Sequence, residues 1–127
     1  MVRRRFGAWF FVTAVALLSL PVQRGLAGEG GGERKFEITA SRYKFEPAQI
    51  AVEEGDTVRL VLHSADTDHG FAIPALKVKA EIPKGGASVD LSFVASRAGR
   101  FAFACSEYCG MGHKGMTGEL VVTGRLR

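Results

Sequence analysis

The residues with the most distinctive chemistry lie in one short segment near the C-terminus, residues 105–116. This segment contains both cysteines of the chain, one of its three histidines and two of its three methionines. Thiolate, imidazole and thioether groups are the ligands that soft transition metals prefer, copper above all. The glycines between them let the backbone curl tightly. The segment is therefore predicted to be a loop that wraps a metal ion.

The spacing and number of the candidate ligands favour copper, and the segment has one cysteine more than a single copper ion needs. Three residues separate Cys105 from Cys109, three more precede His113, and Met116 follows three positions later. An upstream histidine, His69, lies in a polar turn between two predicted strands. A mononuclear blue-copper site uses two histidines, one cysteine and a weak methionine. The additional thiolate would allow two sulfurs to bridge two copper ions.

Other interpretations of these residues are open. Two cysteines in an exported chain form a disulfide by default, although a disulfide would leave the neighbouring histidine and methionine without a role. A zinc site is a further alternative, but structural zinc loops favour closer cysteine pairs and have little use for a thioether. Taken alone, Met116 fits a hydrophobic core as well as a metal site. The joint occurrence of all the donors favours copper over these alternatives.

The rest of the sequence predicts the β-strands that must position these donors. Apolar residues alternate with polar ones in seven short runs, at residues 36–40, 50–52, 58–62, 71–73, 89–93, 101–105 and 120–122. Alternation with turn signals about every 8 to 12 residues is typical of a sandwich or barrel. We expect an all-β, antiparallel Greek-key sandwich of about seven or eight strands. Its loops 66–70 and 105–116 can then meet at one end, which would bring His69 to the cysteines.

The N-terminal residues differ from this domain in charge and composition. Three arginines precede an uncharged apolar stretch, residues 6–20, and small residues follow at 25 and 27. We expect residues 1–27 to be a cleaved export signal or an uncleaved membrane anchor, residues 28–34 a flexible linker, and residues 35–127 the folded domain. The protein would then be periplasmic or lie on the outer face of the cytoplasmic membrane.

Net charge argues against a nucleic-acid partner. The 13 acidic and 13 basic residues after Ala27 balance, so the net charge of +4 belongs to the N-terminal segment. No basic surface is left to neutralise phosphates. No serine has a base and an orienting acid at recognisable spacing, so we assign no catalytic residue.

Two motifs resemble one known family. The pattern Cys-Ser-Glu-x-Cys-Gly-x-x-His-x-x-Met at residues 105–116 resembles the dinuclear copper A (CuA) loop of cytochrome c oxidase subunit II. The segment His-Gly-Phe-x-Ile-Pro at residues 69–74 resembles the upstream histidine segment of that family. The resemblance covers about residues 36–122 and implies a cupredoxin-like fold. It also implies a cofactor of two copper ions.

The resemblance assigns a role to each donor. It implies that Cys105 and Cys109 bridge the two copper ions and that His69 and His113 each bind one of them. It implies two weaker ligands, the Met116 thioether and the backbone carbonyl of Glu107.

The resemblance also implies a function and its partners. The domain would accept electrons from a c-type cytochrome or a cupredoxin and pass them to a haem-copper oxidase subunit I. A freestanding exported copper carrier or electron shuttle is the alternative function.

This chain departs from the family at the expected point of electron entry. The family uses an aromatic cluster with tryptophan near the copper, whereas the only tryptophan here, Trp9, lies in the N-terminal segment. Tyr43, Phe45 and Tyr108 are the candidate substitutes. The family also has two membrane helices before the copper domain, where this chain has one short apolar segment at most.

Overall fold

The computed structural model describes residues 31–126. The predicted signal or anchor, residues 1–27, and the first three residues of the predicted linker, 28–30, lie outside the described residues. Within the described part, no helix is long and apolar enough to cross a membrane. The elements are nine strands and two 3₁₀ helices: β1 (Glu33–Ser41), β2 (Lys44–Glu46), β3 (Gln49–Glu53), β4 (Thr57–Ser64), β5 (His69–Ile73), η1 (Pro74–Leu76), β6 (Val78–Ile82), β7 (Val89–Val94), β8 (Gly99–Ala104), η2 (His113–Gly115) and β9 (Thr117–Thr123).

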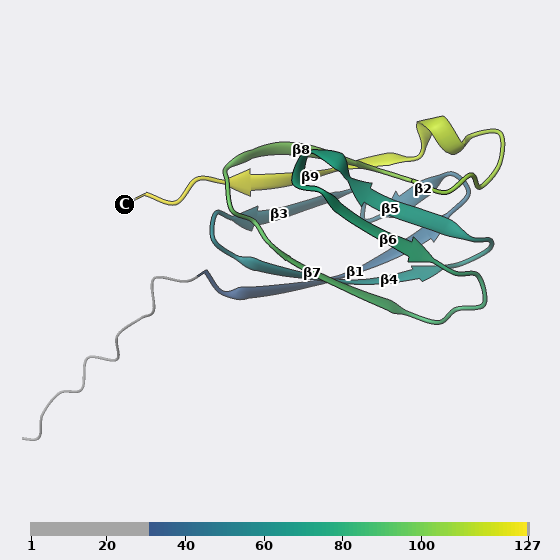
Figure 1. The fold of residues 1–127 in the computed structure, drawn as a ribbon, viewed down its shortest axis with the longest axis horizontal. Coiled ribbons are helices and arrows are strands. Elements are labelled where there is room, and N and C mark those ends of the chain that lie inside the picture. Colours follow the sequence, from purple (N-terminus) through teal and green to yellow (C-terminus); the bar gives the residue numbers. More distant parts are fainter. Residues whose placement is uncertain (1–30, 127) are drawn as a thin grey trace, which may run out of the picture.

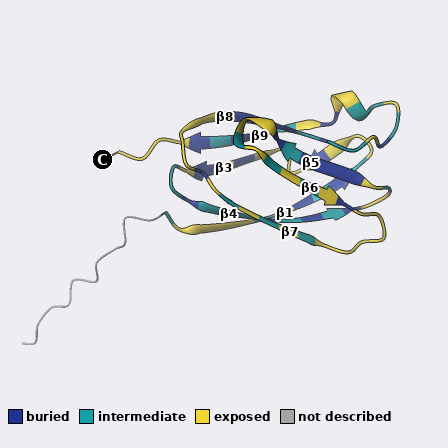
Figure 2. Ribbon diagram, viewed as in Figure 1, coloured by how far each residue is buried: buried dark blue, intermediate teal, exposed yellow. Residues whose placement is uncertain are grey.

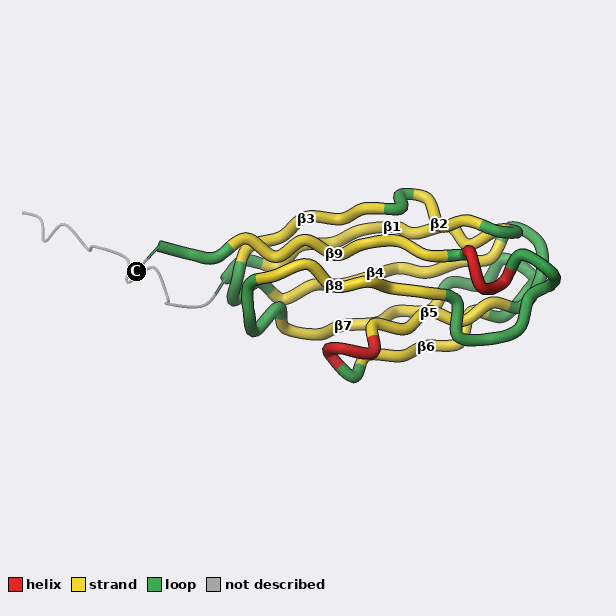
Figure 3. The backbone as a smooth tube through the Cα atoms, turned by 90° about the horizontal axis from the view of Figure 1, so that it is seen from above, coloured by secondary structure: helices red, strands yellow, loops and turns green. Residues whose placement is uncertain are grey.

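The strands form two sheets that face each other, which confirms the predicted all-β sandwich (Figures 1 and 3). One sheet has the order β2-β1-β4-β7 and the other has the order β3-β9-β8-β5-β6. The chain crosses repeatedly between them, so that β3 lies beside β9 and β1 beside β4.

The expectation of a purely antiparallel sandwich is wrong for two strand pairs. β1 pairs with β4 and β3 pairs with β9 in parallel, because the chain between the partners crosses to the other sheet before it returns. Alternation along one strand reports which face is buried but not the direction of the neighbouring strand. Two strands, β2 and β6, are additional to the seven predicted runs.

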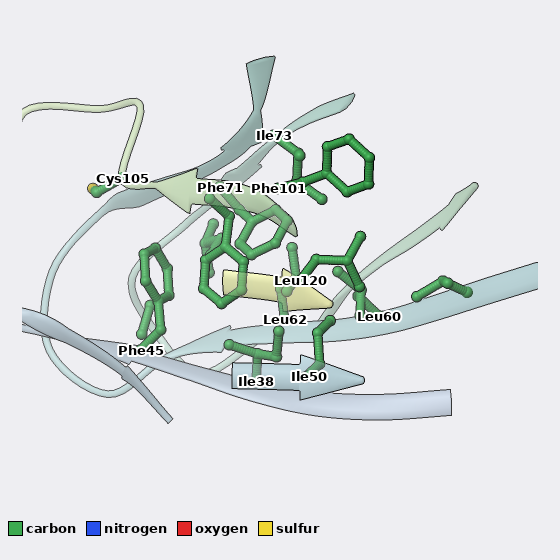
Figure 4. Close-up of a cluster of buried hydrophobic side chains, with 14 of the residues drawn as sticks. Ile38, Phe45, Ile50, Leu60, Leu62, Phe71, Ile73, Phe101, Cys105 and Leu120 are labelled. Carbon is green, nitrogen blue, oxygen red and sulfur yellow. The ribbon is translucent and has the colours of Figure 1, made fainter. Parts of the chain in front are cut away.

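The core lies between the two sheets (Figure 2). β4 shows the alternation most clearly, because every second residue along it is buried. Three phenylalanines, Phe45, Phe71 and Phe103, pack with ring centroids 4.9 to 5.7 Å apart. Burial of each such side chain contributes about 1.5–3 kcal/mol. Cys105 lies at one end of this core, beyond Phe71 and Phe45 (Figure 4).

The fold brings the two predicted loops to the same end of the sandwich. Residues 105–116 connect β8 to β9 and carry η2, at the end of the molecule opposite the C-terminus (Figure 1). The connection from β4 to β5 reaches this end as well, and β5 begins with His69 itself. Because both segments leave packed strands, their positions are fixed by the core beneath them.

Candidate metal centre

The donor loop is closed at its base by the sheet. β8 and β9 are paired up to Ala104 and Thr117, and the Cys105 N–H then donates to the Met116 carbonyl oxygen at 3.1 Å. Further on, the His113 N–H donates to the Gly110 carbonyl oxygen at 3.1 Å. Gly110 has φ +138°, a backbone conformation that favours glycine. The loop thus folds back on itself and turns its sulfur atoms inward.

The two cysteine sulfurs form the middle of a compact cluster. The Sγ atoms of Cys105 and Cys109 are 3.6 Å apart, and both cysteines are free and buried. A disulfide would bring these atoms to about 2.05 Å. Cys105 Sγ also lies 3.9 Å from His69 Nδ1 and 3.0 Å from the Glu107 carbonyl oxygen. One imidazole and one carbonyl therefore accompany the first sulfur.

A second imidazole and a thioether accompany the other sulfur. Cys109 Sγ lies 3.7 Å from His113 Nδ1 and 3.8 Å from Met116 Sδ. Met116 and His69 are almost completely buried, whereas His113 is half-buried. The structure thus brings all six residues predicted from the sequence into one cluster, divided between the two sulfurs.

Burial changes the chemistry of the thiols. It is the main reason that the pKa of the Cys109 thiol is raised to about 11, and the neighbouring Cys105 contributes to the same rise. Both effects disfavour a thiolate in apolar surroundings beside another sulfur. A bound cation would reverse this preference, because a coordinating thiol loses its proton.

Asp66 orients the upstream histidine, and sequence analysis missed it. Its Oδ1 lies 2.6 Å from His69 Nε2, which leaves Nδ1 of the ring facing Cys105. Burial raises the pKa of Asp66, but N–H donors from the Arg42 backbone, the His69 ring and the Thr67 backbone outweigh that effect and hold the pKa at about 2. A carboxylate that fixes the ring of a metal-binding histidine is a common supporting contact. The available signal was an aspartate three residues before the histidine.

The turn between β1 and β2 also contacts the donor loop, which the sequence did not predict. Arg42 Nε donates to the Cys109 carbonyl oxygen at 3.0 Å. The Tyr43 ring lies so close to Gly112 that a Cβ there would be 2.5 Å from ring atoms. The second half of the loop is therefore held from outside as well as by its own turns.

The three aromatic candidates for electron entry differ in exposure. Tyr108 is 74% exposed and its ring centroid lies 5.8 Å from that of His113. Tyr43 is 39% exposed, against the loop glycines. Phe45 is only 1% exposed and belongs to the core, so it offers no surface to a partner. Tyr43 and Tyr108 remain the candidates that a partner can contact.

The donor set suits a soft metal ion. Two thiols, two imidazoles, a thioether and a carbonyl converge, and one ligand atom each from His69, Cys105 and Cys109 lie within 4.8 Å of one another. The two sulfurs together with a thioether favour copper over zinc. Each cysteine sulfur has its own imidazole nitrogen within 3.9 Å.

Comparison with known proteins points the same way. Residues 7–122 match the family described as the cupredoxin-like domain. Cytochrome c oxidase subunit 2 of Thermus thermophilus is 29% identical over 93 residues, which are 73% of this chain and 68% of that protein. The matched segment covers smaller shares of other curated relatives with this name, 55% of a second Thermus thermophilus sequence and 23% of the Saccharomyces cerevisiae protein.

Solved structures share the architecture. The periplasmic domain of subunit II of cytochrome oxidase from Bradyrhizobium japonicum superposes with a TM-score of 0.59 at 21% identity, covering 71% of this chain and 83% of that one. At this identity the likeness shows the fold alone. A haem-copper terminal oxidase dimer, determined by cryo-electron microscopy, contains a chain with TM-score 0.61 and 26% identity, covering 82% of this chain and 74% of that one.

Proposed function

The chain belongs to the cupredoxin-like domain family, and from that premise we propose that it transfers electrons through a dinuclear copper centre. In this proposal the protein acts as a cytochrome c oxidase subunit II-like component. The division of four further donors between the two adjacent cysteine sulfurs carries this proposal, because each sulfur has its own imidazole and its own weaker donor. A mononuclear site would leave one thiol and its neighbours without a role.

Each residue is proposed to hold copper as follows. Cys105 and Cys109 would hold both ions, His69 and His113 would bind one ion each, and the Met116 thioether and the Glu107 carbonyl would be two weaker ligands. When bound, such a copper pair would accept and release one electron shared between both metals.

The scaffold supports this chemistry by keeping the ligands still. Cys105 and Met116 adjoin the ends of the paired strands β8 and β9, and Asp66 fixes the His69 ring. Side chains held by packing and by hydrogen bonds keep the ligand geometry close to its working form in both oxidation states. Buried donors also exclude water from the site. His113 and the exposed Tyr108 lie on the outer side of the loop, which gives electrons a short route from the surface.

The proposed partners lie on either side of this electron route. A c-type cytochrome or a cupredoxin is the donor, and a haem-copper oxidase subunit I is the acceptor. The names of the Thermus thermophilus relative and of the haem-copper terminal oxidase dimer support this placement. The domain is proposed to work outside the cytoplasmic membrane, in the periplasm or on the membrane surface, with residues 1–27 serving as a signal or an anchor.

Metal loading tests the proposal directly. We expect the exported domain to bind two copper ions per chain and to give an electron spin resonance pattern from one unpaired electron shared by both. Met116→Leu is the matched control, because it removes a weak ligand and should keep both ions while shifting the reduction potential. One copper per chain with a four-line pattern would contradict the dinuclear centre. Recovery of the native protein free of any haem-copper subunit would favour the freestanding carrier or shuttle.

A further inference from the structure

The turn between β1 and β2 reaches the donor loop with a charged side chain. Arg42 Nε donates to the Cys109 carbonyl oxygen at 3.0 Å, although 67 positions separate the two residues in the sequence. The adjoining Tyr43 side chain covers Gly110 and Gly112, where added Cβ atoms would lie 2.4 Å from its hydroxyl oxygen and 2.5 Å from its ring. The loop has no room to move toward the turn, and the arginine restrains it from moving away.

Arg42 is also connected to the other half of the site through its backbone. Its N–H donates to Asp66 Oδ2 at 2.7 Å, and Asp66 Oδ1 lies 2.6 Å from His69 Nε2. One residue therefore links the segment that carries the upstream histidine to the segment that carries the second cysteine. A substitution of its side chain breaks only the link to Cys109, because the backbone link remains.

We propose that Arg42 is a positioning residue of the metal site, which holds the Cys109 segment in place and whose charge raises the reduction potential of the copper pair. The second half of this statement rests on the proposed function, whereas the first half concerns the protein chain alone. Reduction adds an electron to the site, and a nearby cation favours the state with the additional negative charge. An arginine keeps its charge at every accessible pH.

The position of the guanidinium predicts how this effect responds to salt. Arg42 is an exposed residue, while the Cys109 thiol is buried. Ions screen a partly exposed charge, and the Debye length falls from about 10 Å at 0.1 M to about 3 Å at 1 M ionic strength. A contribution of the Arg42 charge should therefore shrink as salt is added. A change in loop packing alone would not depend on salt in this way.

The metal-free protein tests the restraint. We compare wild type with Arg42→Met and Arg42→Lys, and use Arg59→Met as the matched control, because Arg59 on β4 pairs with Asp90 on β7 rather than with the loop. Hydrogen exchange at the amides of residues 106–112 should become several-fold faster in Arg42→Met and stay unchanged in Arg59→Met. Equal exchange in wild type and Arg42→Met would overturn the positioning role.

The copper-loaded protein tests the charge. The reduction potential should fall in Arg42→Met, stay near the wild-type value in Arg42→Lys and not move in Arg59→Met. The gap between wild type and Arg42→Met should narrow as ionic strength rises. An equal fall in Arg42→Lys, or a gap that salt does not change, would overturn the electrostatic role. If wild type binds no copper pair, the proposed function fails, while the exchange measurement still decides the positioning role.

Discussion

The two ends of the sandwich solve the problem of buried polar groups in different ways. At the end near the C-terminus, the buried Asp56 carboxylate accepts from the Glu53 N–H at 2.9 Å and from Arg34 and Arg125 at 3.4 Å each. At the opposite end, thiols, imidazoles and a thioether face one another at 3.6 to 3.9 Å. The first arrangement is complete without a ligand, because a carboxylate is matched by cations and N–H groups. The second arrangement gathers metal-ligand groups, which interact more favourably with a metal cation than with one another.

Two aspartates make the contrast specific. Asp56 and Asp66 both accept hydrogen bonds from backbone N–H groups, and both have lowered pKa values. Asp56 ties together a turn, β1 and the C-terminal residues, so its partners all belong to the scaffold. Asp66 uses one oxygen on the scaffold and the other on a histidine of the donor cluster. An aspartate thus supports the fold at one end of the sandwich and the candidate metal site at the other.

The largest effect should come from removing the central sulfur of the donor cluster. Cys109→Ser replaces the thiol that contacts Cys105, His113 and Met116. A hydroxyl is a poor ligand for a soft ion, so we expect loss of the second copper and of the shared-electron resonance. Copper analysis and spin resonance measure both losses. An unchanged spectrum would show that this sulfur does not bind metal. The two ends of the sandwich would then no longer differ in their need for a bound cation.

A smaller effect at the same end should follow from Asp66→Asn. The amide oxygen still accepts from His69, but the negative charge is lost and the amide group cannot accept from all three N–H donors of Arg42, Thr67 and His69. Loss of such a supporting contact costs about 10–100-fold in metal affinity, and we expect the lower end of that range. Competition with a copper chelator measures the affinity. A loss of thermal stability in the metal-free protein, with copper affinity unchanged, would place Asp66 with the scaffold instead.

The sequence predicts the core strands well because alternation is a local pattern, and the spacing of the candidate donors is local too. Alternation along β4 and β8 follows from which face is buried, and the spacing of Cys105, Cys109 and His113 lies within one loop. His69 is adjacent to this loop because the loops of a sandwich gather at its ends. These features need little knowledge of the distant chain.

Features that depend on which distant segments meet could not be predicted in the same way. The parallel pairing of β1 with β4 is set by chain crossings between the sheets, and alternation does not report it. The sequence around Arg42 and Asp66 is typical of surface turns and shows no distinctive pattern. Only the folded chain brings Arg42 to Cys109. Phe45 resembles Tyr43 as an aromatic near the site, but the pleat of the β2 strand turns Phe45 into the core.

The smallest effect is expected at the scaffold end, from Asp56→Asn, and it should depend on pH. The Glu53 N–H is the main cause of the lowered pKa of Asp56, with Arg34 and Arg125 adding to it, although burial opposes them. A carboxyl group with a lowered pKa in the folded state stabilises the fold above its ordinary pKa of 3.8, and this stabilisation is lost as the pH falls through the lower folded value. Asparagine cannot ionise, so the variant lacks this contribution at every pH.

We therefore expect thermal unfolding of Asp56→Asn to occur a few degrees below that of wild type at pH 7. The gap should close as the pH is lowered below 3.8, because wild type then loses the same contribution. Asp66 titrates in both proteins, so its own acid response cancels in the comparison. Copper binding at pH 7 should be equal in the two proteins, since Asp56 and its arginine partners lie at the opposite end of the sandwich from the metal-ligand residues. A gap that stays constant with pH would mean that Asp56 acts through packing and not through its charge. A loss of copper affinity would mean that the two ends are energetically coupled, and the division between scaffold and metal site would then be a matter of degree.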